Sequence, residues 1–446
     1  LVGYISSIKT VMYLVLKWHA AVNKFNLNSN LRTLFRQGSF FISTFLCLTI
    51  ITATQSVNDV QIIGNNHTKS SIILREIFHP IPEKFDTLLS QQDRNRIYNL
   101  NIFSTVEIYP QDSTYTIFVN ESPHYYPIPL MDYNEAKGWS YGLGIRTDNF
   151  SGLNESIIGG AMFGEDPVYF FRYSNPWIWG DHIGLTLDLL NINSEHHVYD
   201  SLKYEKAFYI GSGFQWNKFH NISGSLGYVQ RTLESIANKD MPSYEFNHIA
   251  SQFSYTYDSR DVKIDPTMGN LSGIDFSSNW GLATSPNYHS IELFSQFYFS
   301  PIKSKYSPTF SYTLKSLFQF TDSYLPYYQK EYLGGEDYVR GYSPTPNDNG
   351  KFENFIEVDQ LIYQSIQTQF TIFPRDDRDG MEMGLDGVFF VDYGMGTTLK
   401  NTFNLENSIY GFGCGLRLFM SGFGFIGLDV GFNPSGNFHT HLSDSD

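Results

Sequence analysis

Cysteine is almost absent from this chain, and charged side chains are scarce. The 446 residues include two cysteines, Cys47 and Cys414, too few for a disulfide framework or a four-cysteine zinc site. Charged residues make up 17 %, below the roughly 25 % of ordinary soluble domains. The net charge of −15 disfavours nucleic acid as a partner, because nucleic acid is bound through cationic contacts to phosphate. We therefore expect neither a nucleic-acid-binding protein nor an ordinary soluble domain.

Motifs of catalysis and metal binding are also scarce. The sequence has no phosphate-binding Gly-rich loop ending in lysine and no His-Glu-x-x-His motif. His439 and His441 have the spacing of one strand face, but two histidines without a third ligand are a weak basis for a metal site. Residues 376–380 lack the ligand spacing of a calcium site and fit a tight hairpin turn better. We expect no enzyme activity, no cofactor and no metal.

Long apolar runs are confined to the beginning of the chain. The run Phe40–Ala53 has 14 residues, fewer than the ~20 that a membrane-spanning helix needs. Arg32 and Arg36 precede this run and the small residue Ala53 closes it, which is the layout of a secretory signal peptide. A membrane-anchor helix is the alternative interpretation. We expect residues 1–56 to be a leader with a signal peptide, and we leave residues 1–39 out of the fold.

Aromatic residues and glycine, by contrast, are abundant, and from residue 138 onward they follow a period of two. Phe412, Cys414 and Leu416 alternate with Gly411, Gly413 and Gly415, as do similar sets in many other segments. An apolar face opposite a polar or glycine-rich face is typical of a membrane β-barrel with lipid outside and water inside. A soluble β-sandwich is the alternative, but the alternation continues for too long. We predict a mainly β fold, a 16-stranded antiparallel transmembrane β-barrel over residues 138–446.

Residues 57–123 have the pattern of a small α+β domain. Val60 and Ile62 alternate with polar neighbours as in a strand, and Thr68 can cap a following helix. The predicted order is β-α-α-β-β, with helices over 68–78 and 85–100 and strands over 104–109 and 115–119. Val60–Asn65, Ile102–Val106 and Val119–Glu121 resemble the corresponding parts of a POTRA domain. That resemblance implies a sheet edge that receives unfolded or partner chains.

The most specific segment is Tyr332–Tyr342, which contains Gly334, Gly335, Val339, Arg340, Gly341 and Tyr342. It resembles the sixth-loop signature of the outer-membrane protein assembly factor (bacterial surface antigen) superfamily. Residues 147–152, 257–269 and 411–417 together with Asp429 resemble other segments of that family in the family's order. The resemblance implies that the loop folds into the barrel lumen and that Arg340 pairs with an acidic residue of the inner wall. Asp392 in Phe389–Gly394 is the best candidate partner.

Two departures from the family pattern affect these expectations. Gln367 and Gln369 stand where the family often has glutamate, so we expect Arg340 to have fewer acidic partners. The family's last strand usually finishes on an aromatic residue, whereas Phe438–Leu442 runs here into Ser443–Asp446. Either a few residues are missing or the insertion signal is unusual. We expect the final strand to pair weakly, at the place where this family is expected to have a lateral seam.

The resemblance implies a function without covalent chemistry. We expect an insertase or translocase in the outer membrane of a Gram-negative-type envelope, with its POTRA domain in the periplasm. Its partners would be outer-membrane lipids, unfolded client proteins and periplasmic or lipoprotein partners. A secretion pore for one dedicated protein and a passive outer-membrane channel are the two alternatives.

Overall fold

The computed structural model describes most of the chain after residue 55. The described residues are 56–134, 138–164, 168–180, 182–196, 201–235, 243–302, 304, 306–335, 337–343, 357–378, 381–399, 401, 403–420 and 424–444. Two compact units divide the chain, Leu1–Ser56 and Val57–Asp446. The expected signal peptide lies outside the described residues, and all that follows concerns the second unit.

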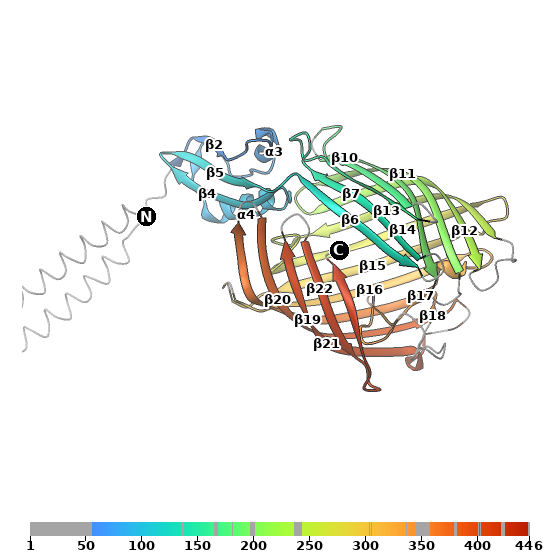
Figure 1. Cartoon of the computed structure of the whole chain (residues 1–446). Helices are drawn as coiled ribbons and strands as arrows, with labels where there is room; N and C mark the ends of the chain where they lie inside the picture. The colour runs from blue at the N-terminus through green and yellow to red at the C-terminus, as the bar shows by residue number, and fades with distance from the viewer. Residues whose placement is uncertain are drawn as a thin grey trace, which may run out of the picture. The chain divides into compact units, whose positions relative to one another are not determined.

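The amino-terminal part of this unit is a small α+β domain (Figure 1). Its elements are β1 Ser56–Val57, β2 Asp59–Ile63, α3 Ser70–Leu74, β3 Glu83–Lys84, α4 Thr87–Tyr98, β4 Phe103–Gln111 and β5 Thr114–Glu121. The central strand β5 pairs in parallel with β2 and antiparallel with β4. Its inward residues Tyr115, Ile117 and Val119 are buried together with Ile73 and Ile97. Alternating apolar residues of β5 thus form the floor on which both helices pack.

Helix α3 is shorter than the 68–78 helix that the sequence predicts. Its N-cap residue is Lys69, which makes no side-chain capping bond. Thr68 does not cap the helix: its backbone N–H donates to Glu121 over 2.7 Å, and its hydroxyl accepts from Asn149. Helix α4, in contrast, has a true cap, because Asp86 accepts from the backbone N–H groups of Leu88 and Leu89.

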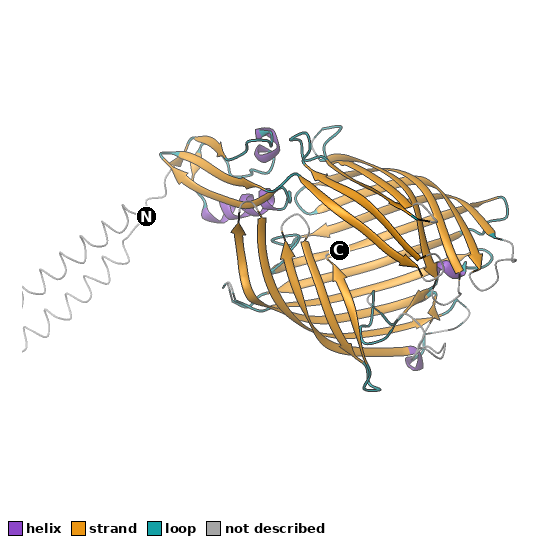
Figure 2. Ribbon diagram, in the orientation of Figure 1, coloured by secondary structure: helices purple, strands orange, loops and turns teal. Residues whose placement is uncertain are grey.

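The rest of the unit is one antiparallel sheet of sixteen strands, orange in Figure 2. The strands are β6 Tyr125–Asn134, β7 Gly138–Asp148, β8 Ser156–Phe163, β9 Val168–Asn175, β10 Ile183–His196, β11 Ser201–Trp216, β12 His220–Ser235, β13 Tyr244–Asp258, β14 Met268–Leu282, β15 Tyr288–Phe299, β16 Thr309–Thr321, β19 Gln360–Arg378, β20 Met381–Thr397, β21 Ser408–Met420, β22 Gly424–Phe432 and β23 Phe438–Asp444. Each strand pairs with the next along the chain, except that β16 pairs with β19 across a long connection. The predicted mainly β fold with sixteen antiparallel strands is confirmed.

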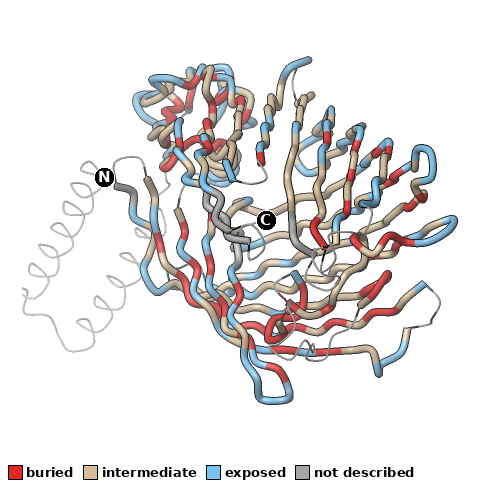
Figure 3. The backbone as a smooth tube through the Cα atoms, turned by 45° about the vertical axis from the view of Figure 1, so that its right-hand side comes forward, coloured by how far each residue is buried: buried red, intermediate tan, exposed pale blue. Residues whose placement is uncertain are grey.

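Burial alternates along these strands, as Figure 3 shows. In β20, Phe389 and Val391 are 58 % and 54 % exposed, whereas Phe390 and Asp392 are 2 % and 0 % exposed. The outer face of β20 is therefore apolar, whereas its inner face also carries polar groups such as Asp392, as expected with lipid outside and water inside. Within the described residues, no helix combines the length and apolar character needed to cross a membrane.

The first strand of the sheet begins at Tyr125, before the residue 138 at which the predicted barrel starts. Two prolines, Pro127 and Pro129, make β6 look unlike a strand in the sequence. Proline has no backbone N–H, so it is tolerated in a sheet mainly on edge strands. β6 is such an edge, because it pairs only with β7.

The other edge of the sheet is β23, which pairs only with β22, from Phe432↔Phe438 to Ile426↔Asp444. Among the described residues, no ladder of hydrogen bonds joins β23 to β6. We call the boundary between these two strands the seam.

Candidate functional site: the Arg340 loop

The Gly-Gly…Val-Arg-Gly-Tyr segment lies in the connection between β16 and β19. It follows the 3₁₀ helix η1 (Tyr327–Gln329) and the short strand β17 (Glu331–Tyr332), which pairs with β18 (Glu357–Val358). We call residues 333–343 the Arg340 loop; residue 336 lies outside the described part. Within it, Gly334 bridges Val339, and the N–H of Gly335 donates to the carbonyl of Val339 over 3.1 Å. The loop is therefore a tight fold of backbone on backbone.

Apolar side chains anchor this loop to the inside of the sheet. Val339 is fully buried and packs with Leu333, Tyr338 and Tyr342 of the loop. The sheet and β18 supply the rest of this cluster, Leu317, Val358, Leu361 and Ile409. The hydroxyl of Tyr342 donates to the carbonyl of Tyr410 over 3.0 Å. Glycine is required at 334, because a Cβ there would collide with the side chain of Tyr342.

Arg340 binds Asp392 of β20 through three hydrogen bonds. Its Nε lies 2.8 Å from Asp392 Oδ2 and its Nη2 lies 2.9 Å from Oδ1, a two-pronged pairing of guanidinium and carboxylate. The backbone N–H of Arg340 also donates to Oδ2, over 3.2 Å. Ser365 Oγ donates to Oδ1 over 2.7 Å, so both oxygens of this carboxylate are used. The structure thus brings together the two residues that the family resemblance pairs.

A second carboxylate, that of Asp429 on β22, completes the charge cluster. Arg340 Nη1 donates to Asp429 Oδ2 over 2.8 Å, and Arg417 of β21 binds both oxygens of Asp429 over 2.6 and 2.8 Å. Gln367 Oε1 lies 3.5 Å from Arg340 Nη1, too far for a good hydrogen bond. Gln367 thus supplies no carboxylate to Arg340, as its side chain predicts. The second acidic partner of Arg340 comes from another strand.

The four charges of this cluster balance and are shielded from water. Asp392 and Asp429 are fully buried, and Arg340 and Arg417 are each 8 % exposed. The guanidinium carbon of Arg340 also lies 3.5 Å from the centre of the Phe390 ring, a cation–π contact. Buried ion pairs hold geometry well, since removing one partner leaves an uncompensated charge. These ion pairs hold the loop in place, and none of the four side chains is a nucleophile or general base aimed at a substrate. We call Arg340, Asp392 and Asp429 the latch.

Arg417 and Asp429 were not identified as partners of Arg340 from the sequence. Both are single charged residues among apolar and glycine residues of strands, and each lies on the inward-facing side of the alternation. That pattern is a usable signal, because a charge on the inner face of a barrel strand needs a partner. The register that brings these strands to Arg340 is set only by the folded sheet.

Arg375 of β19, which is half-buried, has similar surroundings but does not touch the Arg340 loop. It contacts Asp265 Oδ2 over 2.5 Å and Asp386 Oδ2 over 3.0 Å, and it lies 3.8 Å from the centre of the Phe419 ring. Asp265 belongs to the turn between β13 and β14. Arg375 therefore fixes that turn to β19 and β20.

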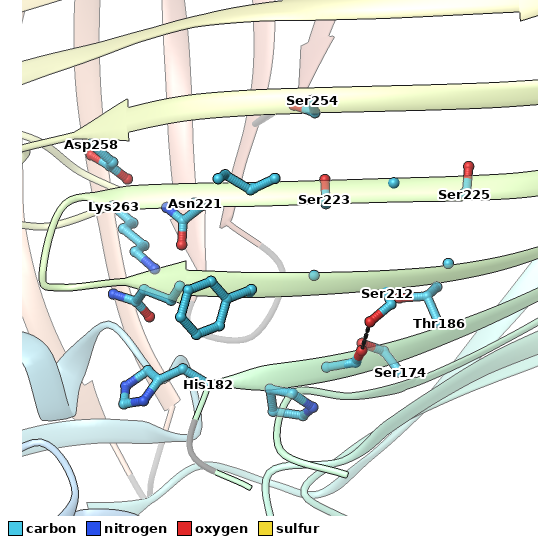
Figure 4. A pocket seen from close by; sticks show the side chains of 18 of the residues that line it. Ser174, His182, Thr186, Ser212, Asn221, Ser223, Ser225, Ser254, Asp258 and Lys263 are labelled. Atoms are coloured by element: carbon cyan, nitrogen blue, oxygen red, sulfur yellow. Dashed lines mark hydrogen bonds between the residues drawn. The ribbon is translucent and has the colours of Figure 1, made fainter. Parts of the chain in front are cut away.

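A cavity of about 1250 Å³ lies inside the sheet. Figure 4 shows small polar side chains of neighbouring strands lining it: Ser174, Thr186, Ser212, Asn221, Ser223, Ser225 and Ser254. Asp258 and Lys263 add charges of opposite sign, and Glu76 of the small domain also borders the cavity. Burial raises the pKa of Glu76, although Arg96, Lys263 and Arg75 oppose this shift. The cavity is a water-compatible space without a strong charge of one sign.

A sequence motif of enzymatic chemistry occurs in β7 but lacks the geometry that the chemistry needs. Gly138–Gly142 has the letter pattern of the nucleophile elbow of serine hydrolases, a match not recognised in reading the sequence. An elbow needs a sharp turn between a strand and a helix, whereas this segment lies within β7. The described residues include no group of three or more potential ligands that could hold a metal ion.

Comparisons with known proteins agree with this architecture. Residues 149–441 match a family model described as the Omp85 superfamily domain. The crystal structure of BamA from Haemophilus ducreyi lacking POTRA domains 1–3 matches with a TM-score of 0.54 and 16 % identity, over 87 % of this chain and 84 % of that chain. CdiB from Escherichia coli matches with a TM-score of 0.50 and 12 % identity, over 87 % of this chain and 76 % of that chain. At such identities the two structural matches establish the fold alone.

Proposed function

The chain belongs to the Omp85 superfamily, and from this we propose that it is an outer-membrane barrel that inserts other outer-membrane proteins. The small domain at residues 57–123 would be a POTRA domain in the periplasm that receives unfolded client chains. Client strands, outer-membrane lipids and periplasmic or lipoprotein subunits would be its partners. No step of this function needs a cofactor or covalent chemistry.

The observation that carries this proposal is the seam. β6 and β23 each have one hydrogen-bonded neighbour among the described residues, so each offers a free strand edge. A free edge presents backbone donors and acceptors to any extended chain, whatever its sequence. A client strand could thus pair with the seam before it moves into the lipid. The latch formed by Arg340, Asp392 and Asp429 would keep the barrel in shape while the seam is open.

The cavity favours a second candidate function, a secretion pore for one dedicated protein. Its lining gives an extended polypeptide many neutral hydrogen-bonding groups of serine, threonine and asparagine, and the charged side chains among them are of both signs. Such a surface allows a chain to slide without being held. A passive channel for small solutes is the weakest candidate, because it would need neither the small domain nor a loop latched inside the lumen.

Depletion of the protein in its own cells, followed by proteomics of the outer membrane and the medium, separates these functions. Broad loss of barrel proteins from the outer membrane would support the insertase. Loss of one exported protein with the barrels unchanged would support the secretion pore. An unchanged proteome with altered uptake of small solutes would contradict both.

The same question can be asked with purified components. The full chain in liposomes is expected to accelerate the folding of an unfolded barrel client, followed by the heat-sensitive gel mobility of the folded client. Liposomes that contain the Arg340→Ala variant serve as the matched control. Equal folding rates with wild-type protein and with empty liposomes would exclude the insertase.

A further inference from the structure

The backbone of Gly341, next to the latch, is held on both sides by the last two strands. Its N–H donates to the ring Nε2 of His441 on β23 over 3.1 Å. Its carbonyl accepts from Asn433 Nδ2, in the turn between β22 and β23, over 2.9 Å. His441 and Asn433 are 4 % and 2 % exposed, so both bonds are shielded from water.

Glycines allow this close approach. Gly341 has a φ of +102°, and a Cβ there would collide with the backbone of Phe432. A Cβ at Gly431 of β22 would collide with the backbone of Gly341. The Arg340 loop therefore lies directly on the backbone of the terminal hairpin, which is β22, its turn and β23.

Asn433 serves the turn and the loop at once. While its Nδ2 binds Gly341, its Oδ1 accepts from the N–H groups of Ser435 and Asn437 over 3.0 and 3.3 Å. The position of the loop and the shape of the turn are thus fixed by one buried amide. Among the described strands, β23 pairs only with β22. The hydrogen bond from Gly341 to His441 is therefore an important second attachment of β23.

The bond to His441 depends on the protonation state of the imidazole. Nε2 can accept from Gly341 only if the ring is neutral and its proton is on Nδ1. The charged groups facing the ring are Arg340 of the loop, Asp392 of β20 and Asp429 of β22, with His439 on the same strand. Together with Arg417, these arginines and aspartates already balance. A proton on His441 would therefore remove an acceptor and add an uncompensated charge beside Arg340.

We propose that His441 is a positioning residue that couples the Arg340 loop to the seam strand β23. When the imidazole is neutral, the loop and β23 are held together. When it is protonated, both are released. The proposal builds on the proposed function, since it identifies what controls the order of the seam.

Hydrogen–deuterium exchange on the full chain in detergent micelles tests this coupling. We compare peptides covering 333–343 and 438–444 in wild type, His441→Ala, His441→Gln and the control His439→Ala, at pH 8 and pH 5.5. Exchange is corrected for its intrinsic pH dependence. His441→Ala is expected to speed exchange in both peptides at least about tenfold at pH 8, the effect of losing one buried hydrogen bond.

The pH profile distinguishes coupling from mere packing. Wild type is expected to lose protection of both peptides as the pH falls from 8 to 5.5 and the imidazole of His441 takes up a proton. His441→Gln keeps an acceptor that cannot be protonated, so it should stay protected at both pH values. The matched control His439→Ala should behave as wild type.

Several results would overturn the proposal. These are loop protection that is unchanged in His441→Ala, an equal effect of His439→Ala, and acid loss in His441→Gln as large as in wild type. The client-folding assay gives a separate answer. A coupled loop and strand in a protein that folds no client would contradict the proposed function and leave the coupling standing.

Discussion

Arg340 brings one positive charge to two buried carboxylates that lie on different strands. A guanidinium is suited to this position, because its planar fork can bind Asp392 with two nitrogens and Asp429 with the third. Its flat face can also lie on the ring of Phe390. A lysine would bring the same charge but could not make these contacts together.

Replacing Arg340 tests the latch directly. Arg340→Ala leaves Asp392 buried without its cation, and we expect a loss of about 3–5 kcal/mol in the free energy of unfolding. Arg340→Lys should lose less, about 1–3 kcal/mol, because the charge remains and the fork is lost. Urea unfolding in detergent micelles measures both.

Arg375→Ala is the matched control for Arg340→Ala, since Arg375 also lies between two aspartates and over a phenylalanine ring. It should destabilise the barrel but leave the Arg340 loop protected from hydrogen exchange. If Arg375→Ala exposed the loop as much as Arg340→Ala does, the latch would not be specific to Arg340.

Exchanging the two charges of the pair is expected to fail as a rescue. In Arg340→Asp combined with Asp392→Arg, the new aspartate would face Asp429, which now lies 2.8 Å from the arginine. The neutral pair Arg340→Gln with Asp392→Asn leaves Asp429 balanced by Arg417, and should recover more than half of the stability that Arg340→Ala loses. Urea unfolding of the three variants checks this. Full recovery in the exchanged pair would show that Asp429 does not matter.

At this scale, the sequence predicts what lies within one segment better than what meets across strands. Arg340 and Asp392 could be named because each belongs to a recognisable local motif. Nothing in the local sequence around Asp429, Arg417 and His441 indicates that they meet the Arg340 loop. They join the site through the register of β21, β22 and β23, and a shift of one residue would turn them to the other face.

Helix α4 depends on its amino-terminal cap. Asp86 accepts from the N–H groups of Leu88 and Leu89 over 2.7 and 3.1 Å, which satisfies two donors that the helix itself cannot. Asp86→Ala should therefore cost about 1 kcal/mol of local stability, and Asp86→Ser much less. Hydrogen exchange of residues 87–98 measures both. An equal effect of the two substitutions would mean that the cap bond is not what stabilises α4.

Glu76, two residues after the end of α3, makes the small domain sensitive to pH. Burial raises the pKa of Glu76 above that of the unfolded chain, so the folded domain binds this proton more tightly. The stabilising effect is present at low pH and is lost as the pH rises through the folded pKa. Exchange of residues 70–98 should therefore speed up from pH 5 to pH 8 in wild type, after intrinsic correction. Glu76→Gln should remove this dependence, and a persisting dependence would assign it to another group.

The elements show where sequence patterns suffice and where they do not. Period-two alternation identified the strands of the sheet, because one face of each is apolar and the other is not. It missed β6, where Pro127 and Pro129 break the usual strand composition. The predicted helix at 68–78 was too long, because backbone bonds after Leu74 shift to shorter spacing, as in Glu76 N–H to Ile73 carbonyl.

For the whole molecule, the main question is why a sheet of sixteen strands keeps two free edges. In a barrel closed by hydrogen bonds, every backbone group is satisfied inside the membrane. Here β6 and β23 leave one edge each without a described partner strand. Pro127 and Pro129 of β6 also disfavour closure of the seam, because each lacks a backbone N–H that could donate to β23. We interpret the seam as a feature that the sequence maintains.

Restoring these donors should therefore close the seam. Pro127 and Pro129 are two positions apart, so their nitrogens face the same side of β6. Both side chains are exposed on the outer face, where valine also fits. In Pro127→Val with Pro129→Val, two new N–H groups become available to β23, each hydrogen bond contributing about 1 kcal/mol.

The variant should unfold at higher temperature on heat-sensitive gels and should fold clients more slowly in liposomes than wild type does. Pro110→Val on β4, an edge strand of the small domain, is the matched control and should change neither property. A more stable variant that folds clients at the wild-type rate would show that insertion does not use this seam.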